Sequence, residues 1–153
     1  MAITESNKLD KVVLLDSLMK RINFLNEVIE NEHINNVETI HGRVEDIGQD
    51  LKYREKFDIA TSRAVAPLNV LVEYLIPLVK VDGIVICMKG PKLNEELEDA
   101  KNAITKLGGK IEQIEELKIN NEITRNALII RKIKQTDRMF PRKAGLPSKK
   151  PIK

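Results

Sequence analysis

Residues 11–21 read KVVLLDSLMKR, an apolar run that ends on an acid and leads into an amphipathic pattern. A short apolar run between polar residues is typical of a parallel strand covered on both faces, so we expect a buried strand over 12–15. Asp16 would then stand at the carboxyl end of that strand, where nucleotide-binding α/β folds hold ribose hydroxyls. Asp and Ser also cap helices well, so Asp16 with Ser17 could instead open the next helix. This stretch by itself leaves both interpretations open.

The rest of the chain alternates between helical and strand-like patterns. This alternation predicts a doubly wound parallel sheet with helices on both of its faces. The last two strands are joined by so short a link that they must form an antiparallel hairpin. Residues 43–56 are highly charged and are expected to form a loop with helical turns. Helices are expected over 17–31, 67–79 and 92–107, and strands over 12–15, 37–41, 57–61, 84–88, 111–119 and 126–133.

Composition places the chain among soluble globular proteins. It has 153 residues, of which 42% are hydrophobic and 32% charged, enough for one domain with a real core. No apolar run approaches the length that spans a bilayer. Cys87 is the only cysteine, so we expect no disulfide framework, no cysteine-based zinc cluster and a buried apolar role for its side chain. A cytoplasmic protein without a metal or a membrane partner is therefore the expectation.

Positive charge is concentrated at the C-terminus. Residues 135–153 hold six lysines and arginines against one aspartate, a net charge of +5, which leaves −2 for the rest of the chain. A nearly neutral body with a basic tail predicts a polyanionic partner, with RNA as the natural candidate. A solvated, disordered basic end is the alternative. We therefore divide the chain into a body, residues 1–134, and a basic C-terminal tail, residues 135–153.

Four stretches together resemble one family of enzymes. They are LLDSLMKRINFLNEVI (14–29), HGRVEDIG (41–48), FDIATSRAVAPL (57–68) and FPRKAGLPSKKPI (140–152). The resemblance is to the small-subunit ribosomal RNA methyltransferase G family, also called glucose-inhibited division protein B, and it runs from about Lys11 to the C-terminus. That family transfers a methyl group from S-adenosylmethionine (SAM) to N7 of guanine 527 of 16S ribosomal RNA.

The resemblance implies a cofactor site. Asp16, with Ser17 beside it, would take the ribose hydroxyls of SAM, and Val44 and Glu45 match the family's contact to the adenine end. Arg63 matches the family's cofactor-site arginine, at the end of a strand where the ligand crevice of such sheets opens. An arginine there can engage the methionine carboxylate or an RNA phosphate, although a surface ion pair is the plainer alternative.

RNA contacts are expected at basic residues. Lys89 follows the strand 84–88 and could contact the substrate or be an ordinary strand-end lysine. The tail motif supplies the other candidates. Guanine N7 carries a free lone pair and loses no proton on methylation, so an enzyme can act mainly by positioning. No arrangement of catalytic side chains is visible in the sequence, and we assign none. The predicted RNA-binding residues are Lys89, Arg142, Lys143, Lys149 and Lys150.

One feature of the family is missing. A central strand and a glycine-rich loop should precede residue 11, but the seven glycines begin at Gly42. The resemblance therefore implies a class I SAM-dependent methyltransferase (Rossmann-like) α/β sheet without its first strand and loop, and with unpaired edges at strands 12–15 and 57–61. The first hypothesis is a 16S ribosomal RNA guanine-N7 methyltransferase fragment of doubtful activity. A non-enzymatic RNA-binding or regulatory remnant is the alternative, and another nucleotide-binding α/β domain is a weaker one.

Overall fold

The computed structural model describes residues 11–63, 66–119 and 123–153, which fall into two compact units, Met1–Val44 and Glu45–Lys153. Three parts of the predictions lie outside the described residues. These are residues 1–10, the middle of SRAVAPL at 64–65, and the tip of the predicted hairpin at 120–122.

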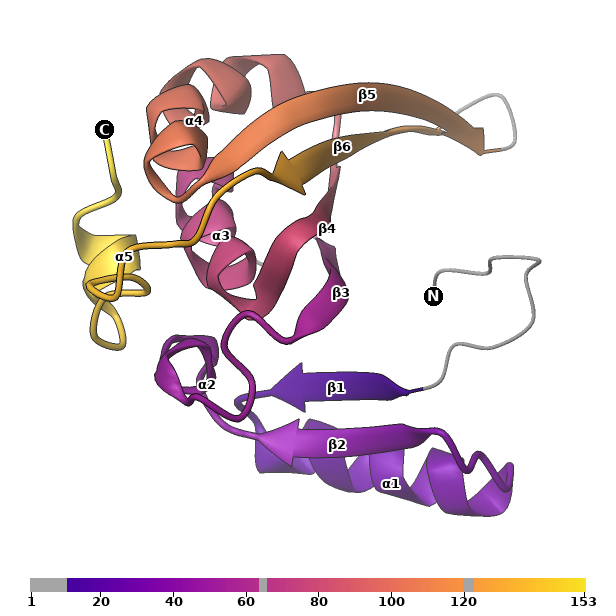
Figure 1. The fold of residues 1–153 in the computed structure, drawn as a ribbon. Helices are drawn as coiled ribbons and strands as arrows, with labels where there is room; N and C mark the ends of the chain where they lie inside the picture. The colour runs from indigo at the N-terminus through magenta and orange to yellow at the C-terminus, as the bar shows by residue number, and fades with distance from the viewer. Residues whose placement is uncertain (1–10, 64–65, 120–122) are drawn as a thin grey trace. The chain divides into compact units, whose positions relative to one another are not determined.

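The first unit is a strand–helix–strand arrangement (Figure 1). It contains β1 (Val12–Asp16), α1 (Met19–Asn31) and β2 (Val37–His41), and its strands pair in parallel with Val12 opposite Val37. The predicted strands and the helix between them are confirmed. The expected full burial of the first strand is not observed, because every side chain of β1 is half-buried. Among the described residues of this unit, only Ile22 of α1 is buried.

The second unit contains most of the regular structure. Its first helix, α2, starts at the boundary between the units and occupies part of the predicted charged loop. The predicted helix 67–79 ends earlier than expected because Pro77 converts its last turn into a short 3₁₀ helix. The elements are α2 (Val44–Gln49), β3 (Phe57–Arg63), α3 (Leu68–Leu75), the 3₁₀ helix η1 (Ile76–Leu78), β4 (Val79–Lys89), α4 (Leu93–Lys106), β5 (Gly109–Ile119), β6 (Ile123–Lys132) and α5 (Leu146–Lys149).

The sheet of the second unit has the order β3-β4-β6-β5. β3 and β4 are parallel, and β6 runs antiparallel to both of its neighbours, which confirms the predicted closing hairpin. The predicted strand 84–88 starts earlier than expected, because Asp82 and Gly83, residue types common in turns, lie inside β4, where the pairing with β3 shifts register. A Cβ at Gly83 would lie 2.7 Å from the carbonyl oxygen of Asp58, so only glycine allows this close approach.

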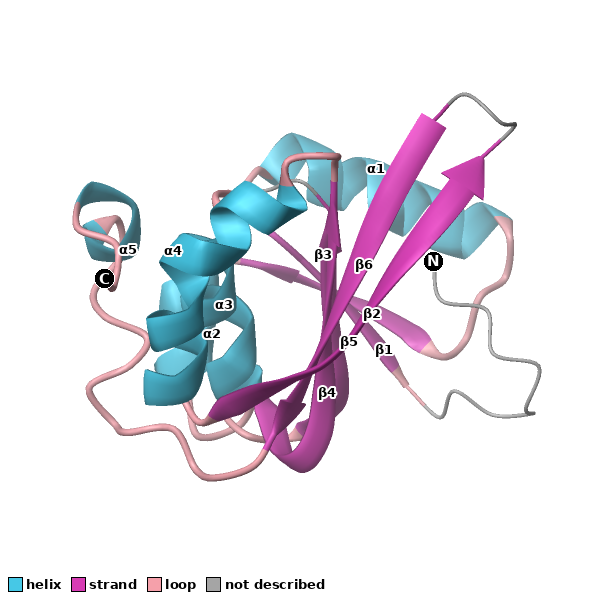
Figure 2. Cartoon of the chain, turned by 90° about the horizontal axis from the view of Figure 1, so that it is seen from above, coloured by secondary structure: helices cyan, strands magenta, loops and turns pink. Residues whose placement is uncertain are grey.

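Helices α3 and α4 lie side by side on one face of this sheet (Figures 1 and 2). The core beneath them includes Cys87, which is fully buried as predicted. It also includes Phe140 and Ile152 from the C-terminal segment. The predicted division at residue 134 therefore does not separate compact units, because two apolar side chains bury the tail in the same core. In the described part of the chain, no helix is both long and apolar enough to cross a membrane.

Candidate functional site

Asp16 ends β1 and shapes the turn into α1. Its Oδ1 accepts a hydrogen bond from the Leu18 N–H at 2.8 Å, and its Oδ2 lies 3.2 Å from Nη1 of Arg21. The Leu18 hydrogen bond and the nearby Arg21 together lower the pKa of the Asp16 carboxyl, against a weaker opposing effect of burial. The group is therefore ionised at neutral pH. A carboxylate has about four lone-pair sites, so the turn hydrogen bond leaves acceptors for a ligand. The alternative that Asp16 and Ser17 cap the helix is wrong, because the N-cap of α1 is Leu18 and no side chain caps the helix. The hydrogen bond of Asp16 closes the preceding turn and is compatible with a ligand role.

Two hydrogen bonds join the carboxyl ends of β1 and β2. The Gly42 N–H donates to the Asp16 carbonyl oxygen at 3.1 Å, and His41 Nε2 donates to the Ser17 carbonyl oxygen at 3.1 Å. These contacts fix the backbone around Asp16 and leave the side chain of Ser17 exposed. Among the residues that the structure describes, no group of His, Cys, Asp and Glu side chains could hold a metal ion.

Glu45 lies in the first turn of α2 and is only 6% exposed. Its Oε1 accepts a hydrogen bond from the Gly145 N–H at 2.9 Å, so the tail reaches one of the residues expected to contact the adenine end. The other oxygen, Oε2, has no hydrogen bond within the described part of the chain. Val44, the neighbouring candidate, is half-buried and closes the first unit.

Arg63 and Lys89 end the paired strands β3 and β4 in very different surroundings. Arg63 is exposed, and no side chain among the described residues pairs with it. Lys89 is 7% exposed, and its Nζ donates to the Ala66 carbonyl oxygen at 2.8 Å and to Glu96 Oε2 at 2.7 Å. The same Glu96 oxygen accepts the Leu68 N–H at the start of α3. Lys89 is thus engaged in holding the start of α3.

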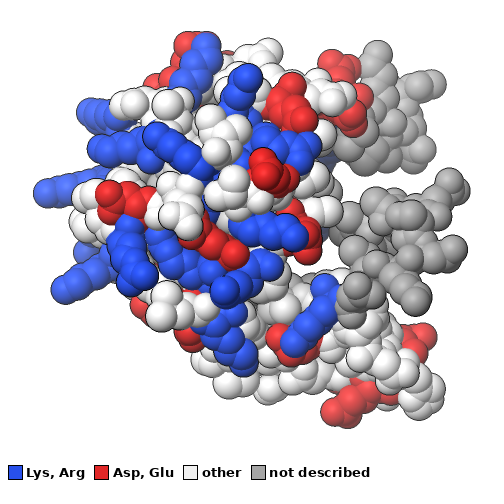
Figure 3. All heavy atoms as spheres, in the orientation of Figure 1, with Lys and Arg blue, Asp and Glu red and all other residues white. Residues whose placement is uncertain are grey.

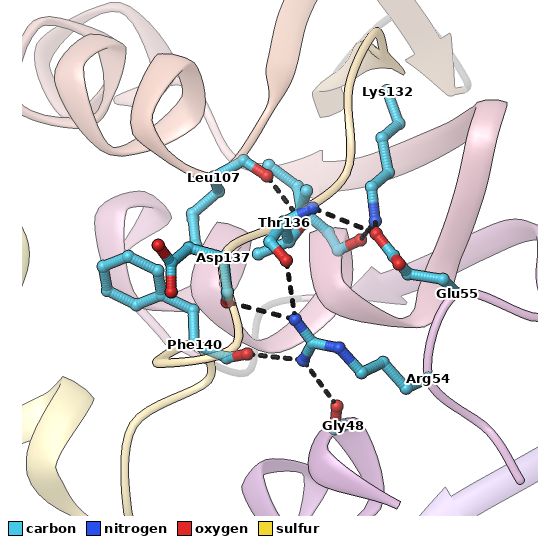
Figure 4. A network of polar contacts seen from close by, with 9 residues as sticks. Gly48, Arg54, Glu55, Leu107, Lys132, Thr136, Asp137 and Phe140 are labelled. Carbon is cyan, nitrogen blue, oxygen red and sulfur yellow. Dashed lines mark hydrogen bonds and ion pairs between the residues drawn. The ribbon is translucent and has the colours of Figure 1, made fainter. Parts of the chain in front are cut away.

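Arg54 fixes the beginning of the tail (Figure 4). Its Nη1 donates to the carbonyl oxygens of Gly48 at 3.0 Å and Phe140 at 2.5 Å. Its Nη2 donates to those of Thr136 at 2.8 Å and Asp137 at 3.1 Å. One buried guanidinium therefore joins α2 to three carbonyl groups of the tail, a task that suits the planar, multi-donor arginine side chain.

A buried ion pair lies next to this network (Figure 4). Lys132 is fully buried, and its Nζ lies 2.5 Å from Glu55 Oε1, which also accepts the Thr136 N–H at 3.0 Å. Burial lowers the pKa of Lys132, while Glu55 opposes that shift. Burial alone would raise the pKa of Glu55, but its hydrogen bonds from Lys132 and Thr136 hold it below the ordinary 4.5.

The middle of the tail is fixed by Glu73, which is fully buried in α3. Its Oε1 accepts the backbone N–H and the Nε–H of Arg142, both at 2.9 Å, and its Oε2 accepts from Nη2 at 2.6 Å. This bidentate pair raises the pKa of Arg142. Of the other predicted RNA-binding residues in the tail, Lys143, Lys149 and Lys150 are exposed and have no ion-pair partner among the described residues.

The sequence analysis missed the residues that hold the tail in place. Glu73 carried a usable signal, since it is a charge inside the apolar run LNVLVEYL, whereas Lys132 only follows the apolar run of NALIIRK, after Arg131. A charge in such a run is almost never fully buried unless it is paired. Arg54 carried none, because it lies in a stretch where most residues are charged.

Comparisons with known proteins place both the fold and the family. A ribosomal RNA methylase from Streptococcus thermophilus superposes with a TM-score of 0.59 at 15% identity, covering 81% of this chain and 74% of that one. TYW2 of M. jannaschii, solved in complex with AdoMet, gives a TM-score of 0.58 at 15% identity over 80% of this chain and 57% of that one. The fold is accordingly that of the class I SAM-dependent methyltransferases, as predicted.

Relatives in sequence are much closer. Proteins named ribosomal RNA small subunit methyltransferase G are 55% identical over 146 residues in Alkaliphilus oremlandii and 56% identical over 144 residues in Clostridium perfringens. Each match covers 94% of this chain and 60% of the relative, so the chain spans about three fifths of their length. The GidB family model, described as rRNA small subunit methyltransferase G, matches residues 1–128. The chain therefore belongs to the rRNA small subunit methyltransferase G family.

Proposed function

We propose that this chain carries out SAM-dependent methylation of 16S ribosomal RNA at N7 of guanine 527. Membership of the methyltransferase G family supports the reaction and the RNA substrate. The observation that carries the proposal for this chain is Asp16, an ionised carboxylate at the carboxyl end of a parallel strand, with lone pairs left for a ribose. The small ribosomal subunit is a cytoplasmic particle, so we place the protein in the cytoplasm.

Each candidate residue has a proposed contact to SAM. Asp16 would accept hydrogen bonds from the ribose hydroxyls, and Ser17 would line the same turn. Val44 and Glu45 would meet the adenine, where the free Oε2 of Glu45 can accept a hydrogen bond from the exocyclic amine. Arg63, exposed at the end of β3, would engage the methionine carboxylate. When bound, SAM supplies an activated methyl group.

On the RNA side, we propose phosphate contacts by the exposed residues Lys143, Lys149 and Lys150. Lys89 and Arg142 remain predicted contacts, but each would have to leave a carboxylate, Glu96 or Glu73, to reach a phosphate. Because N7 loses no proton on methylation, the protein needs no general base for this step. Its residues would act by orienting the guanine and excluding water.

Transfer of a tritiated methyl group from SAM to 16S ribosomal RNA that lacks the modification tests the proposal. We expect label at guanine 527, located by chain cleavage at N7-methylguanine, and a strong reduction in the D16N variant. Asp50 provides the matched control, because its Oδ1 accepts the Lys52 N–H at 2.8 Å in the same kind of turn. Transfer by D50N should equal that of the wild type. RNA binding without any transfer would instead favour the non-enzymatic alternative.

A further inference from the structure

The second unit carries exposed cations along its C-terminal segment. Figure 3 shows lysine and arginine side chains gathered on the side where Figure 1 places α5 and the tail. All of these cations are exposed, and none has an ion-pair partner among the described residues. We call them the tail platform: Lys134, Arg138, Lys143, Lys149 and Lys150.

The backbone that carries the tail platform is fixed at its beginning. Four carbonyl groups converge on Arg54, and three of them belong to residues 136–140. The side-chain amide of Gln49 donates to two more, those of Arg138 at 3.1 Å and Pro141 at 2.7 Å. Arg138 is thus exposed on a segment whose peptide groups are held from the protein side.

The second half of the segment is fixed by the helices. Glu73 binds Arg142, Glu45 binds the Gly145 N–H, and the Tyr74 hydroxyl lies 3.0 Å from Ser148 Oγ. A buried apolar side chain anchors each half of the segment, since Phe140 is 3% exposed and Ile152 is 5% exposed. The tail therefore has few of the features of a disordered basic arm, because several of its backbone groups are hydrogen-bonded, and Phe140 and Ile152 are buried, within the unit.

We propose that residues 134–150 form a preorganised phosphate-binding platform for folded RNA, in which Arg54 and Glu73 are positioning residues. This inference rests on the proposed function for the identity of the polyanion. It adds Lys134 and Arg138 to the expected contacts, and it explains why charged residues with no access to RNA are buried under the tail. A fixed array of cations binds more tightly than a flexible one, because less conformational freedom is lost on binding.

Salt dependence of RNA binding tests the role of the platform cations. The probe is a fluorescein-labelled 16S ribosomal RNA fragment that contains guanine 527, titrated by anisotropy at several KCl concentrations. In K149Q/K150Q the slope of log Kd against log salt should become shallower by about 0.7 to 0.9 for each phosphate that the variant no longer neutralises. The control K56Q/K110Q removes two exposed lysines outside the platform and should leave the slope nearly unchanged. An equal change in both variants would overturn the platform in favour of diffuse attraction.

Charge-conserving substitution of Arg54 tests preorganisation. R54K keeps the positive charge but cannot donate to four carbonyl groups at once. We expect R54K to bind RNA about tenfold or more weakly, with an unchanged salt slope. The tail would then be ordered only when RNA binds, and the lost conformational entropy would reduce the affinity. Unchanged affinity in folded R54K would overturn the positioning role.

Hydrogen exchange of the wild-type chain supplies a second test that needs no variant. The amides of Thr136, Arg142 and Gly145 donate to buried or half-buried carboxylates, so they should exchange slowly before RNA is added. Fast exchange that becomes slow only with RNA would contradict preorganisation.

The outcomes also separate this inference from the proposed function. Methyl transfer with a K149Q/K150Q slope equal to that of the wild type would overturn the platform alone. Salt-dependent RNA binding without methyl transfer would contradict the proposed reaction but not the platform.

Met139 and Leu146 are exposed apolar residues on the same segment, so phosphatidylglycerol vesicles serve as a competitor. Tighter binding to vesicles than to RNA would overturn RNA as the partner.

Discussion

The backbone N–H of Gly145 donates a hydrogen bond to Oε1 of Glu45 at 2.9 Å, across a separation of 100 residues in sequence. Gly145 adopts φ +81°, and the space where a Cβ would stand is empty of atoms within 4 Å. Only its backbone conformation therefore opposes a side chain at this position. The tail turns here so that its N–H points at the first turn of α2.

Substitution of Gly145 by alanine should destabilise the second unit through the backbone alone. We expect a loss of about 1 to 2 kcal/mol in the free energy of unfolding, the usual cost of a left-handed conformation for an L-residue. Urea denaturation followed by circular dichroism measures it.

Gly90 provides the matched control for G145A. A Cβ at Gly90 would likewise meet no atom within 4 Å, but the φ of this residue is not positive. G90A should therefore leave the urea concentration at the unfolding midpoint unchanged or raise it slightly. Equal losses in both variants would mean that the positive φ of Gly145 carries no cost.

The buried pair of Glu55 and Lys132 should respond asymmetrically to substitution. E55Q removes the negative charge opposite a fully buried ammonium, whose other hydrogen bond goes to the Ile76 carbonyl oxygen at 3.1 Å, and should cost about 3 kcal/mol or more. K132M removes the buried charge, and the Glu55 carboxylate keeps the Thr136 N–H and partial access to water. We therefore expect K132M to cost less than E55Q in urea denaturation. The reverse order would show that Glu55, not Lys132, is the group that needs its partner.

The same pair predicts a pH dependence. The pKa of Glu55 is lower in the folded chain than its ordinary value of 4.5. A carboxyl with a depressed native pKa stabilises the fold above its unfolded pKa, and this contribution is lost as the pH falls through the native value. The free-energy cost of E55Q should therefore be full at pH 7 and shrink below about pH 4.5. A cost that stays constant down to pH 3 would contradict this assignment.

Much of the fold was predictable because local patterns decided it. The alternation of apolar strands and amphipathic helices, and the short link after residue 119, required parallel strands closed by a hairpin. The long strand β4 was predicted too short, because Asp82–Gly83 has the composition of a turn. Its role as an irregularity inside a strand depends on the neighbouring Asp58 carbonyl group, which no local pattern contains.

The Glu96 carboxylate should prove essential to the start of α3. E96A removes the partner of the buried Lys89 ammonium and the acceptor of the Leu68 N–H, so we expect a loss of about 3 kcal/mol or more. E96Q keeps an acceptor oxygen for Leu68 and should cost clearly less. The stability losses of E96A and E96Q are compared by thermal unfolding. Equal losses would indicate that the charge of Glu96 matters and its hydrogen bond to α3 does not.

The candidate site was only partly accessible from sequence. Asp16 stood out because it follows an apolar strand, and its ordinary turn role and its proposed ligand role could not be separated by pattern. For the tail, composition gave the charge of each residue but not its partner. Arg142 and Lys149 look alike in sequence, yet one faces the buried Glu73 and the other is exposed. That difference arises from an acid 69 residues away in α3.

Calorimetric titration of SAM into the wild-type, D16N and D50N chains tests the central claim most directly. Asn at position 16 can still accept the Leu18 N–H, so the turn is retained while the charge that would bind the ribose hydroxyls is removed. We predict that D16N weakens SAM binding by about 10- to 100-fold, the usual range for losing hydrogen bonds to a charged group, and that D50N binds as the wild type does. SAM binding of equal affinity in the wild type and D16N, or no binding to the wild type, would contradict the account.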